Sequence, residues 1–407
     1  MKTPALCPLD GRYGGRLGAL RSVMSEAAFT ASRVRAELAW FEVLSHLKLP
    51  RFAVLSAQET SLLNNLLPLS EQDLEIIRAL EFDGYEDIPA TKHYVKSVEY
   101  FLKLRLKNTP LRDRLEWFHF ALTSEDINSA AYAVLLADGV EKALCPALEN
   151  LQKDLAKLAR KESRAVLLAR THGQAAVPTT FGKEIRVFEA RLNRQLKELK
   201  KREISLKFGG AVGNYNAHLA AFPKVNWIAA AQRFVAALNK GRKIKIVLTP
   251  VSTQVDNRDT YAELFDNIRR INTVLLGLCQ DMWRYISAGL VHQKTTAGEV
   301  GSSTMPQKVN PIDFENAEGN LQVADALLEL FSRKLPVSRL QRDLSDSTVL
   351  RNMAVAFGYA LTAYLSLLKG LSKISFDRTA AQAELAAHPE VLAEGVQTIL
   401  RAAGYPN

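Results

Sequence analysis

Apolar residues recur at every third or fourth position over long stretches of this chain, with charged residues between them. This spacing places the apolar side chains on one face of a helix, so it predicts long amphipathic helices. A stretch from about 259 to 290 keeps the spacing without a proline. Two other stretches show it through Leu148, Leu151, Leu155 and Leu158, and through Ile185, Phe188, Leu192, Leu196 and Leu199.

The stretch from 259 to 290 predicts a helix of about 30 residues, roughly 45 Å long. A helix of that length needs other long helices beside it, from the same chain or from partner subunits. Two more helices are expected at about 311–334 and 347–371, the first with Pro311 in its first turn. The pattern therefore predicts a bundle of long helices in the middle of the chain.

Few stretches have the pattern of a β-strand. Residues 243–248 (KIKIVL) alternate polar and apolar positions and predict a short hairpin arm. No GxGxxG follows a strand, no β-α alternation runs along the chain, and no repeat of fixed period is present. These absences from the sequence argue against Rossmann, barrel and solenoid folds.

Five stretches rich in glycine and polar residues interrupt the helical pattern, each at the end of a predicted helix. Loops held by rigid elements are where chemistry concentrates, so these stretches are the first candidates for a functional site. They are residues 10–15 (DGRYGG), 121–129 (ALTSEDINS), 170–174 (RTHGQ), 209–216 (GGAVGNYN) and 295–310 (TTAGEVGSSTMPQKVN).

The 407 residues are 47% hydrophobic and 24% charged, which excludes a disordered chain because that apolar content can bury a core. Three widely separated cysteines, Cys7, Cys145 and Cys279, indicate free thiols and no disulfide framework or zinc site. No uncharged apolar run reaches the length of a membrane span, and the N-terminus lacks the apolar core of a signal peptide. We therefore expect a cytoplasmic protein.

Lysine and arginine number 53 against 43 aspartates and glutamates, a net charge of +10. Such an excess suits nucleic acid, an anionic membrane surface or small polyanionic substrates. The densest basic stretches, 197–207 and 240–245, lack the interleaved aromatic residues that stack on bases. Neither nucleic acid nor a membrane is therefore expected as a partner, and a nucleic-acid binder stays a third hypothesis that salt-dependent binding would test.

The remaining motifs favour acid–base chemistry. The seven histidines form no HxH, HxxxH or HxxEH pattern, and no Walker loop or GxSxG elbow is present, so we expect no metal and no cofactor. His172, in a Thr-His-Gly triplet, is a candidate acid or base, although an isolated histidine is more often structural. Ser302 lies in a glycine-rich stretch typical of a lid, where backbone N–H groups and Lys308 could stabilise its alkoxide.

The stretch 301–316, GSSTMPQKVNPIDFEN, resembles the signature of the fumarase/aspartase superfamily, Ser-Ser-x-Met-Pro-x-Lys-x-Asn with a later glutamate, here Glu315. Within that superfamily the chain resembles the adenylosuccinate lyase family, through five further segments that follow the family's order over nearly the whole chain. These segments are PLDGRYGGRLGALR (8–21), HFALTSEDINS (119–129), RTHGQAA (170–176), GGAVGNYNAH (209–218) and KLPVSRLQRDLSDSTVLRN (334–352).

This resemblance implies an all-α, fumarase/aspartase-like fold of three domains. The expected division is an N-terminal helical domain over 1–112, a central long-helix bundle over 113–363 and a partial C-terminal helical domain over 364–407. It also implies a homotetramer in which three subunits assemble each active site. Partner subunits would supply the neighbours that the long helix at 259–290 requires.

The resemblance also implies a reaction, the anti β-elimination of fumarate from adenylosuccinate to give AMP and from the ribonucleotide SAICAR to give AICAR. Such an elimination needs a base for the carbon-bound proton and an acid for the departing nitrogen, on opposite faces. We assign Ser302 as the base and His172 as the acid, with Ser303 as the second candidate for the base. Lys308 and Asn310 match the family's residues that stabilise the charge developing on the neighbouring carboxylate.

Further residues are expected to bind the substrate. By resemblance, Arg12 and Tyr13 face the nucleotide, while Thr123 and Ser124 bind the succinyl carboxylate. Arginines suit the phosphate because they bind it bidentately, although a surface salt bridge is the alternative for Arg342 and Arg351. The other expected substrate-binding residues are Lys92, His93, Ser303, Asn316, Ser347, Thr348 and Gln254, the last reaching a site in another subunit.

Two departures from the family pattern keep alternatives open. Tyr94 stands where the family usually has an aspartate after the histidine, and a tyrosine cannot charge or orient a histidine as a carboxylate does. The chain ends at Asn407, where relatives continue, so we expect a shortened third domain. The alternatives are a non-catalytic tetrameric homologue and a fumarate-releasing lyase with another substrate, such as argininosuccinate; a panel of succinyl-amine substrates would separate them.

Overall fold

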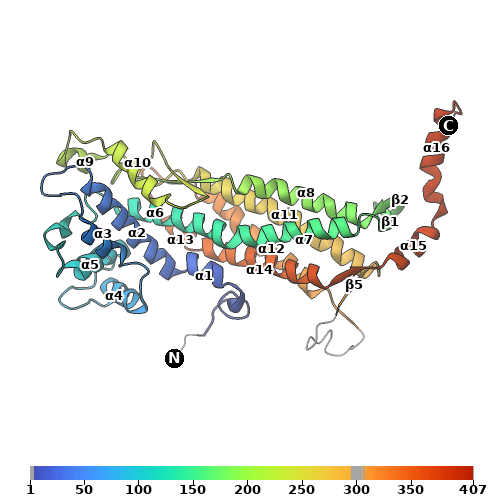
Figure 1. Cartoon of the computed structure of the whole chain (residues 1–407), viewed down its shortest axis with the longest axis horizontal. Coiled ribbons are helices and arrows are strands. Elements are labelled where there is room, and N and C mark those ends of the chain that lie inside the picture. Colours follow the sequence, from blue (N-terminus) through green and yellow to red (C-terminus); the bar gives the residue numbers. More distant parts are fainter. Residues whose placement is uncertain (1–3, 295–304, 306–307, 407) are drawn as a thin grey trace. The chain divides into compact units, whose positions relative to one another are not determined.

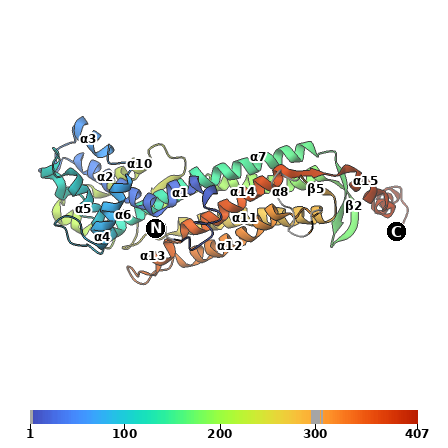
Figure 2. The same cartoon turned by 90° about the horizontal axis from the view of Figure 1, so that it is seen from below.

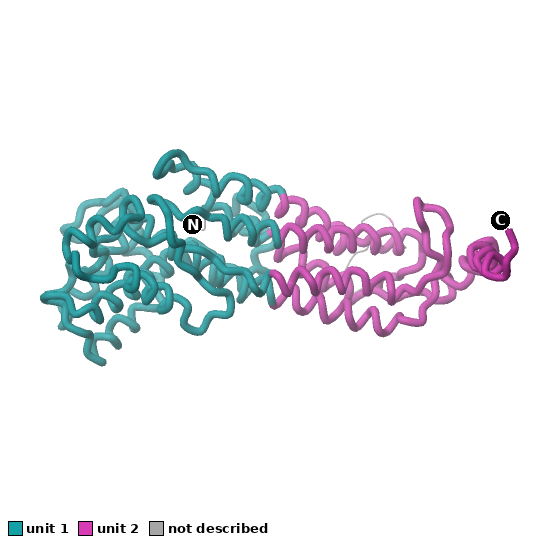
Figure 3. Tube along the Cα trace, turned by 90° about the horizontal axis from the view of Figure 1, so that it is seen from above, with its two compact units in different colours: residues 1–145, 199–267, 326–358 teal, residues 146–198, 268–325, 359–407 magenta. Residues whose placement is uncertain are grey.

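The computed structural model describes all residues except 1–3, 295–304, 306–307 and 407. Helices dominate it (Figure 1), and the chain divides into two compact units (Figure 3). Unit 1 consists of residues 1–145, 199–267 and 326–358, and unit 2 consists of 146–198, 268–325 and 359–407. The three-domain division expected from the sequence stays a prediction.

Unit 1 has a core of aromatic side chains beneath α2 (Glu26–Ser45). Trp40 is fully buried there, with the rings of Phe208 and Phe234 centred 4.8 and 6.2 Å away. The helical elements assigned wholly or mainly to unit 1 are η1 (Gly14–Arg16), α1 (Gly18–Met24), α2, α3 (Ala57–Asn64), α4 (Glu71–Phe82), α5 (Tyr94–Leu106), η2 (Arg112–Trp117), α6 (Ser124–Asp138), η3 (Gly139–Leu144), α9 (Asn216–Ala221), α10 (Trp227–Leu238) and α13 (Ser345–Leu350).

Unit 2 is built from helices that run alongside one another in Figures 1 and 2. The fully buried Asn272 ties three of them, because it donates to Asp325 at 2.7 Å and accepts from the Tyr364 hydroxyl at 2.6 Å. Its helical elements are α7 (Cys145–Lys161), α8 (Phe181–Leu199), α15 (Arg378–Ala386), η4 (Pro389–Leu392) and α16 (Ala393–Ala402), with parts of α11 (Asp259–Ser287), α12 (Ile312–Lys334) and α14 (Met353–Lys373), which unit 1 shares.

The predicted long helices are confirmed in place, with corrections at their ends. α11 covers 29 residues, and the apolar residues at the predicted spacing are buried except Ile286, which is half-buried; the buried ones are Leu264, Ile268, Ile271, Leu275, Leu278 and Met282. Pro311 directly precedes α12 and does not lie inside its first turn. The expected helix over 347–371 is two helices, α13 and α14. The Asn352 side chain donates to the Thr348 carbonyl at 3.0 Å, and such local bonding competes with the regular helix at this break.

The β-structure consists of short paired strands, and the hairpin expected at 243–248 is wrong. β4 (Lys245–Leu248) pairs in parallel with β3 (Glu203–Leu206), a partner about forty residues earlier in the chain. A hairpin lies instead at β1 (Val166–Thr171) and β2 (Gln174–Thr180), so the stretch 170–174 joins strands and does not end a helix. β5 (Val291–Gln293) pairs with β6 (Ile374–Phe376) in an antiparallel sheet.

Residues Ser345–Lys373, which include α14, are long and apolar enough to cross a membrane by length and composition alone. In the structure, 61% of the most apolar window is buried inside the protein. Fully buried side chains such as Phe357, Tyr364 and Leu367 pack in the interior. The burial is that of a core helix.

Candidate active site

The first turn of α6 carries two of the expected carboxylate-binding residues, Thr123 and Ser124, both half-buried. Thr123 caps the helix, and its backbone N–H donates to the Asp126 carboxylate at 2.8 Å. The N-terminus of a helix favours an anion because its first N–H groups have no partner within the helix and the helix dipole is positive there. The location therefore suits a carboxylate of the substrate.

His93 lies beside this turn. The ring caps α5, with Nδ1 accepting from the backbone N–H groups of Val95 and Lys96 at 3.3 and 3.4 Å. A neutral ring that accepts at Nδ1 carries its proton on Nε2, so Nε2 donates to Ser124 Oγ, 3.3 Å away. Lys92 points elsewhere, because its ammonium group donates to the Phe82 carbonyl at 2.6 Å.

An ion-pair network joins this turn to α13. Glu125, only 3% exposed, accepts from Arg342 at 3.1 Å and from Arg258 at 2.9 Å. Arg258 also donates to Asp346 at 3.1 Å, and Ser347 follows Asp346 in α13. Burial raises the pKa of Glu125, and the two arginines oppose that rise. The salt bridge considered for Arg342 is therefore present, as a partly buried pair, and Thr348 is exposed on the same short helix.

A second buried pair fixes the segment that follows β3. Lys207 and Asp126 are both completely buried and lie 2.7 Å apart, and the same carboxylate accepts from the N–H groups of Gly209 and Gly210. Each carboxylate of the α6 turn therefore has a cationic partner, since Glu125 pairs with Arg258 and Arg342 and Asp126 pairs with Lys207. The acidic residues of the α6 turn are thereby neutralised and need not repel an anionic ligand.

Gln254 lies in the loop before α11 and faces the glycine-rich segment 209–216. Its side-chain amide donates to the Ala211 carbonyl at 2.9 Å, and its backbone N–H donates to the Gln341 carbonyl at 3.2 Å. Gly213, with φ +78°, packs so closely that a Cβ there would lie 2.4 Å from the Ser252 carbonyl oxygen. Only glycine fits at that contact, so these two loops need it to lie together.

A cavity of about 370 Å³ lies on the other side of Tyr94. The buried Arg33 lies between two rings of this cavity, with its guanidinium carbon 3.7 Å from the centre of Phe29 and 4.3 Å from that of Tyr94. Burial lowers the pKa of Arg33 to about 10. Tyr94 accepts from the Asn128 amide at 3.3 Å, and Arg351 lines the same cavity. The tyrosine that replaces the expected aspartate therefore packs under an arginine.

Two expected nucleotide-facing residues lie in the turn before η1. Arg12 is exposed and Tyr13 is half-buried. The turn is held by Arg21, which donates to the Leu9 carbonyl at 2.7 Å and to Asp10 at 3.0 Å. No hydrogen bond or ion pair joins Arg12 to the other described site residues.

In unit 2, His172 lies at the tip of the β1–β2 hairpin. His172 and Gly173 have φ of +52° and +76°, as the two central residues of a type I′ turn require. His172 is exposed, and its ring makes no hydrogen bond to any residue that the structure describes. Arg170 supports the tip by donating to the Gly173 carbonyl at 3.4 Å and to Glu384 of α15.

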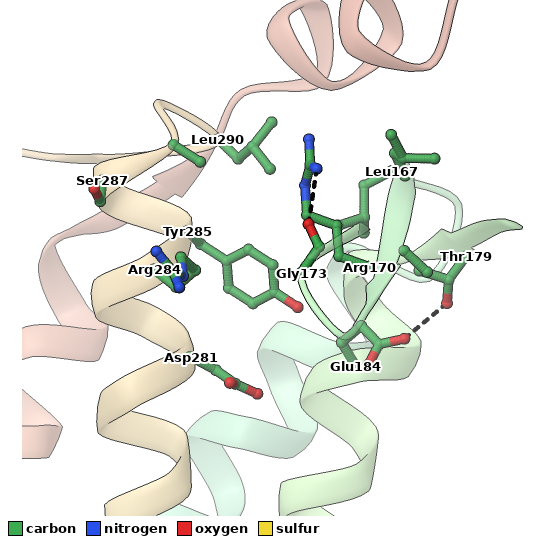
Figure 4. A pocket seen from close by; sticks show the side chains of 13 residues that line it. Leu167, Arg170, Gly173, Thr179, Glu184, Asp281, Arg284, Tyr285, Ser287 and Leu290 are labelled. Atoms are coloured by element: carbon green, nitrogen blue, oxygen red, sulfur yellow. Dashed lines mark hydrogen bonds between the residues drawn. The ribbon is translucent and has the colours of Figure 1, made fainter. Parts of the chain in front are cut away.

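A cavity of about 610 Å³ lies behind this hairpin, and Figure 4 shows its side chains. Tyr285 of α11 points toward the hairpin, and Glu184 of α8 accepts from the Thr179 hydroxyl at 2.8 Å. Burial raises the pKa of Asp281 in the same cavity, with the charge of Glu184 adding to the rise. His172 itself does not line this cavity, although the neighbouring Gly173 does.

The signature stretch is described only in part. Ser302 and Ser303, the two candidates for the base, lie outside the described residues. Lys308 is exposed and Asn310 is half-buried in the segment before α12. Asn316 of α12 accepts from the Ser366 hydroxyl at 2.8 Å, so part of its bonding capacity is used between helices.

Sequence reasoning missed the residues that hold the site together. Glu125, Asp126, Lys207 and Arg258 are not among the expected site residues, and each is nearly or completely buried. Glu125 and Asp126 lie within the polar stretch 121–129, which the sequence pattern marks as a candidate functional region. Their ion-pair partners lie 81 to 217 residues away in the chain, so no local pattern could pair them.

Comparison with known proteins gives a consistent result. A family model described as "Lyase" matches residues 90–324, and one described as "Adenylosuccinate lyase C-terminal" matches 338–407. Adenylosuccinate lyase of Escherichia coli strain K12 is 44% identical over 403 residues, 98% of this chain and 86% of that protein. The enzymes of that name from Legionella pneumophila strain Corby and Dictyostelium discoideum are 43% and 42% identical, over 99% of this chain and 86% and 85% of theirs.

Solved structures agree in fold. A fumarate lyase from Mesorhizobium sp. BNC1 and the 3-carboxy-cis,cis-muconate lactonizing enzyme from Pseudomonas putida each superpose with a TM-score of 0.72. Each comparison covers 94% of this chain and 81% of the other. Their identities are 18% and 20%, so these two similarities concern the fold alone.

Proposed function

This chain belongs to the adenylosuccinate lyase family, the C–N lyases of purine biosynthesis, and from that premise we propose how its residues divide the reaction. Adenylosuccinate and SAICAR are the substrates, and fumarate leaves by anti elimination. Ser302 removes the proton from the succinyl carbon beside a carboxylate. The electron pair of that C–H bond forms the double bond of fumarate, and the C–N pair returns to nitrogen, which takes a proton from His172.

The α6 turn is the observation that carries this proposal. Thr123 and Ser124 lie at a helix N-terminus whose acidic residues are neutralised by buried cations, so the turn can accept the succinyl carboxylate. His93 donates to Ser124 from its Nε2 and holds that hydroxyl in place. Lys308 and Asn310 stabilise the second negative charge that develops on the carboxylate when the proton leaves. Arg12, Tyr13, Ser347 and Arg351 bind the nucleotide end.

We further propose that the enzyme is a cytoplasmic homotetramer with active sites shared between subunits. Two observations support sharing. The first is that His172 is exposed and its ring has no partner among the described residues. The second is that the 29-residue helix α11 buries its apolar face and still leaves the large Trp283 side chain 41% exposed. Gln254 would reach the site of a neighbouring subunit.

The test is an assay of the purified protein with adenylosuccinate that follows the purine absorbance and fumarate release together, repeated with SAICAR. Turnover is expected with both nucleotides and not with argininosuccinate. A folded protein that releases no fumarate from either nucleotide would overturn the proposal in favour of a non-catalytic homologue. Sharing is tested by mixing His172→Ala with Ser302→Ala protein, two variants that we expect to be inactive alone and to regain part of the activity in mixed oligomers.

A further inference from the structure

Arg258 occupies an unusual position in the loop between Gln254 and α11. Its side chain is 1% exposed, and its backbone has φ +60°, in the left-handed region that residues other than glycine rarely adopt. Its N–H donates to the Asp256 carboxylate at 2.8 Å, and Asp256 also accepts from the Ser205 hydroxyl at 2.7 Å. The loop thus holds a buried arginine in a strained backbone conformation by specific hydrogen bonds.

The Arg258 side chain connects three segments that carry expected substrate-binding residues. One nitrogen, Nη2, donates to Glu125 at 2.9 Å and to Asp346 at 3.1 Å. Glu125 directly follows Ser124 in the first turn of α6, and Asp346 directly precedes Ser347 in α13. The third segment is the loop of Arg258 itself, which begins four residues earlier at Gln254. Arg342 joins the same network through the second oxygen of Glu125, at 3.1 Å.

The network is not arranged for the greatest stability. Nη1 of Arg258 is buried and has no hydrogen-bond partner among the described residues, and the hydroxyl of the neighbouring Tyr261 is likewise buried and unpartnered. The guanidinium carbon lies 5.5 Å from the centre of the Tyr261 ring. Unsatisfied buried donors reduce stability, and well-packed apolar residues often replace buried ion pairs without loss. A charged residue kept under these conditions is better explained by what it positions.

We propose that Arg258 is a positioning residue that sets the distance between the two binding segments, the α6 turn for the succinyl carboxylate and α13 with Arg342 for the phosphate. This inference rests on the proposed function of those segments. Arg258 touches no substrate, because it is buried beneath both segments, and it acts through Glu125 and Asp346. Without it, the first turn of α6 and the start of α13 lose their shared partner and separate.

The expected effect falls on substrate binding more than on the chemical step. The substrate spans both segments in the ground state and in the transition state. A looser spacing therefore weakens the binding of the ground state and the binding of the transition state to a similar extent. We expect Arg258→Met to raise KM for adenylosuccinate about tenfold and to change kcat less than about threefold, since small misplacements of binding groups have effects of this size or larger. AMP lacks the succinyl group and does not span both segments, so we expect its dissociation constant to change less than KM for adenylosuccinate.

The conservative variant separates positioning from stability. In Arg258→Lys the charge is kept, but the lysine side chain is one bond shorter than arginine and ends before the position of Nη2, the nitrogen that donates to both carboxylates. We expect Arg258→Lys to recover most of the melting temperature lost in Arg258→Met while KM stays raised. A purely structural role would lower the melting temperature and leave KM and kcat of the folded protein unchanged. If Arg258→Met does not fold, Arg258→Lys decides alone.

Arg202→Met is the matched control. Arg202 is also in unit 1, is 22% exposed and donates to Glu263 at 2.9 Å and to Asn267 at 3.3 Å, none of them an expected site residue. All variants are assayed well below their melting temperatures, and AMP binding is measured by calorimetry as the reference for a ligand that does not span both segments. A KM for adenylosuccinate within twofold of wild type in Arg258→Lys would overturn the proposal.

The two proposals fail in distinguishable ways. If the wild-type protein shows no turnover but binds adenylosuccinate, the proposed function fails, and weaker adenylosuccinate binding by Arg258→Lys still supports positioning. If adenylosuccinate binds that variant as it binds wild type, positioning fails while wild-type turnover can stand. A wild-type protein that neither turns over nor binds adenylosuccinate overturns both.

Discussion

At the first turn of α6, expected site residues stand on a base of buried ion pairs, whereas the β1–β2 hairpin presents His172 at an exposed tip. Ser124 has His93 at 3.3 Å and, beneath it, Glu125 held by two arginines. Within the part of the chain that the structure describes, the tip that carries His172 is supported by its own backbone turn and by the bond from Arg170 to the Gly173 carbonyl. In the first region several expected residues are held by buried ion pairs of unit 1, and in the second a single expected side chain is presented.

The difference follows from what each region has to do. Binding a substrate with several negative charges requires fixed donors and neutralised carboxylates, which a buried network provides before the substrate arrives. A proton donor needs only a titratable ring that can reach the leaving nitrogen. We expect substitutions in the α6 region to affect stability and binding together, and substitutions at the hairpin tip to affect catalysis alone.

His172→Ala tests the hairpin side and has the largest expected effect. Loss of a general acid costs about 10²- to 10⁴-fold in rate, so we expect kcat to fall about 10³-fold. The melting temperature should stay unchanged because the ring is exposed and makes no hydrogen bond to the described residues. Steady-state kinetics and thermal unfolding on the same preparation measure both quantities.

The matched control is His388→Ala, another histidine of unit 2, whose Nδ1 lies 2.8 Å from Glu390. It should keep wild-type kcat. A His172→Ala protein with near wild-type kcat would remove His172 from the mechanism, and one that unfolds would show that the hairpin tip has a structural role after all.

Lys207→Met tests the α6 side. Removing one member of a completely buried ion pair leaves the other charge without compensation, so the free energy of unfolding should fall by about 3 kcal/mol or more. The exposed pair Lys107–Glu86, 2.9 Å apart in the same unit, supplies the control, because Lys107→Met should cost less than about 1 kcal/mol. Urea unfolding of both variants measures the difference, and equal losses would contradict a network that supports the turn.

The sequence predicted the long helices well because their apolar spacing is a local property. α11 ends at Ser287, three residues before the expected end at 290, and α12 begins at Ile312, one residue after the expected start at 311. The parallel pairing of β3 with β4 could not be predicted, since it depends on contacts between segments about forty residues apart. The β1–β2 hairpin was missed because its strands are partly exposed and show no clean alternation.

For the site, motifs located the exposed polar residues, and the structure shows which of them are held together. Ser124, His93 and the Glu125–Arg342 pair form one group in unit 1. The residues beneath them were not predicted, because Arg258 and Glu125 are 133 positions apart and a buried ion pair leaves no periodic signal. The roles assigned to Ser302 and His172 stay predictions.

A pH titration of stability sharpens the comparison further. Glu37 is completely buried, and its carboxylate accepts from the His119 backbone N–H at 3.0 Å and lies 2.6 Å from Nδ1 of the His119 ring. His119 lies four positions before Thr123 in the chain. Burial alone would lower the pKa of His119, but the Glu37 charge raises it above the ordinary value of about 6.5. Folding therefore favours the protonated ring.

This contribution to stability is complete below about pH 6.5 and is lost as the pH rises through the higher pKa of the folded state. We expect His119→Asn to remove this dependence of the free energy of unfolding on pH, and to lower that free energy less than Lys207→Met does. Asparagine is chosen because it tolerates the positive φ of 57° at this position. His46→Asn, at an exposed histidine of the same unit, should keep it. Urea unfolding from pH 6 to 9 measures the slopes, and a slope that survives in His119→Asn would assign it to another group.

Tyr94→Phe has the smallest expected effect and tests how the unit tolerates a tyrosine at this position. The ring stays under Arg33, where cation–π contact is kept, and only the hydroxyl that accepts from Asn128 at 3.3 Å is lost. Asn128 still accepts from Arg33 Nε at 3.0 Å, so we expect the free energy of unfolding to fall by about 0.5 kcal/mol.

Tyr132→Phe is the control, because the Tyr132 hydroxyl has no hydrogen bond to the described residues and its loss should cost less. Tyr94→Asp should cost more than Tyr94→Phe, since a short carboxylate cannot stack under the guanidinium. If Tyr94→Asp were instead the more stable of the two, the ring would not be what holds Arg33, and the α6 region would depend on its ion pairs alone.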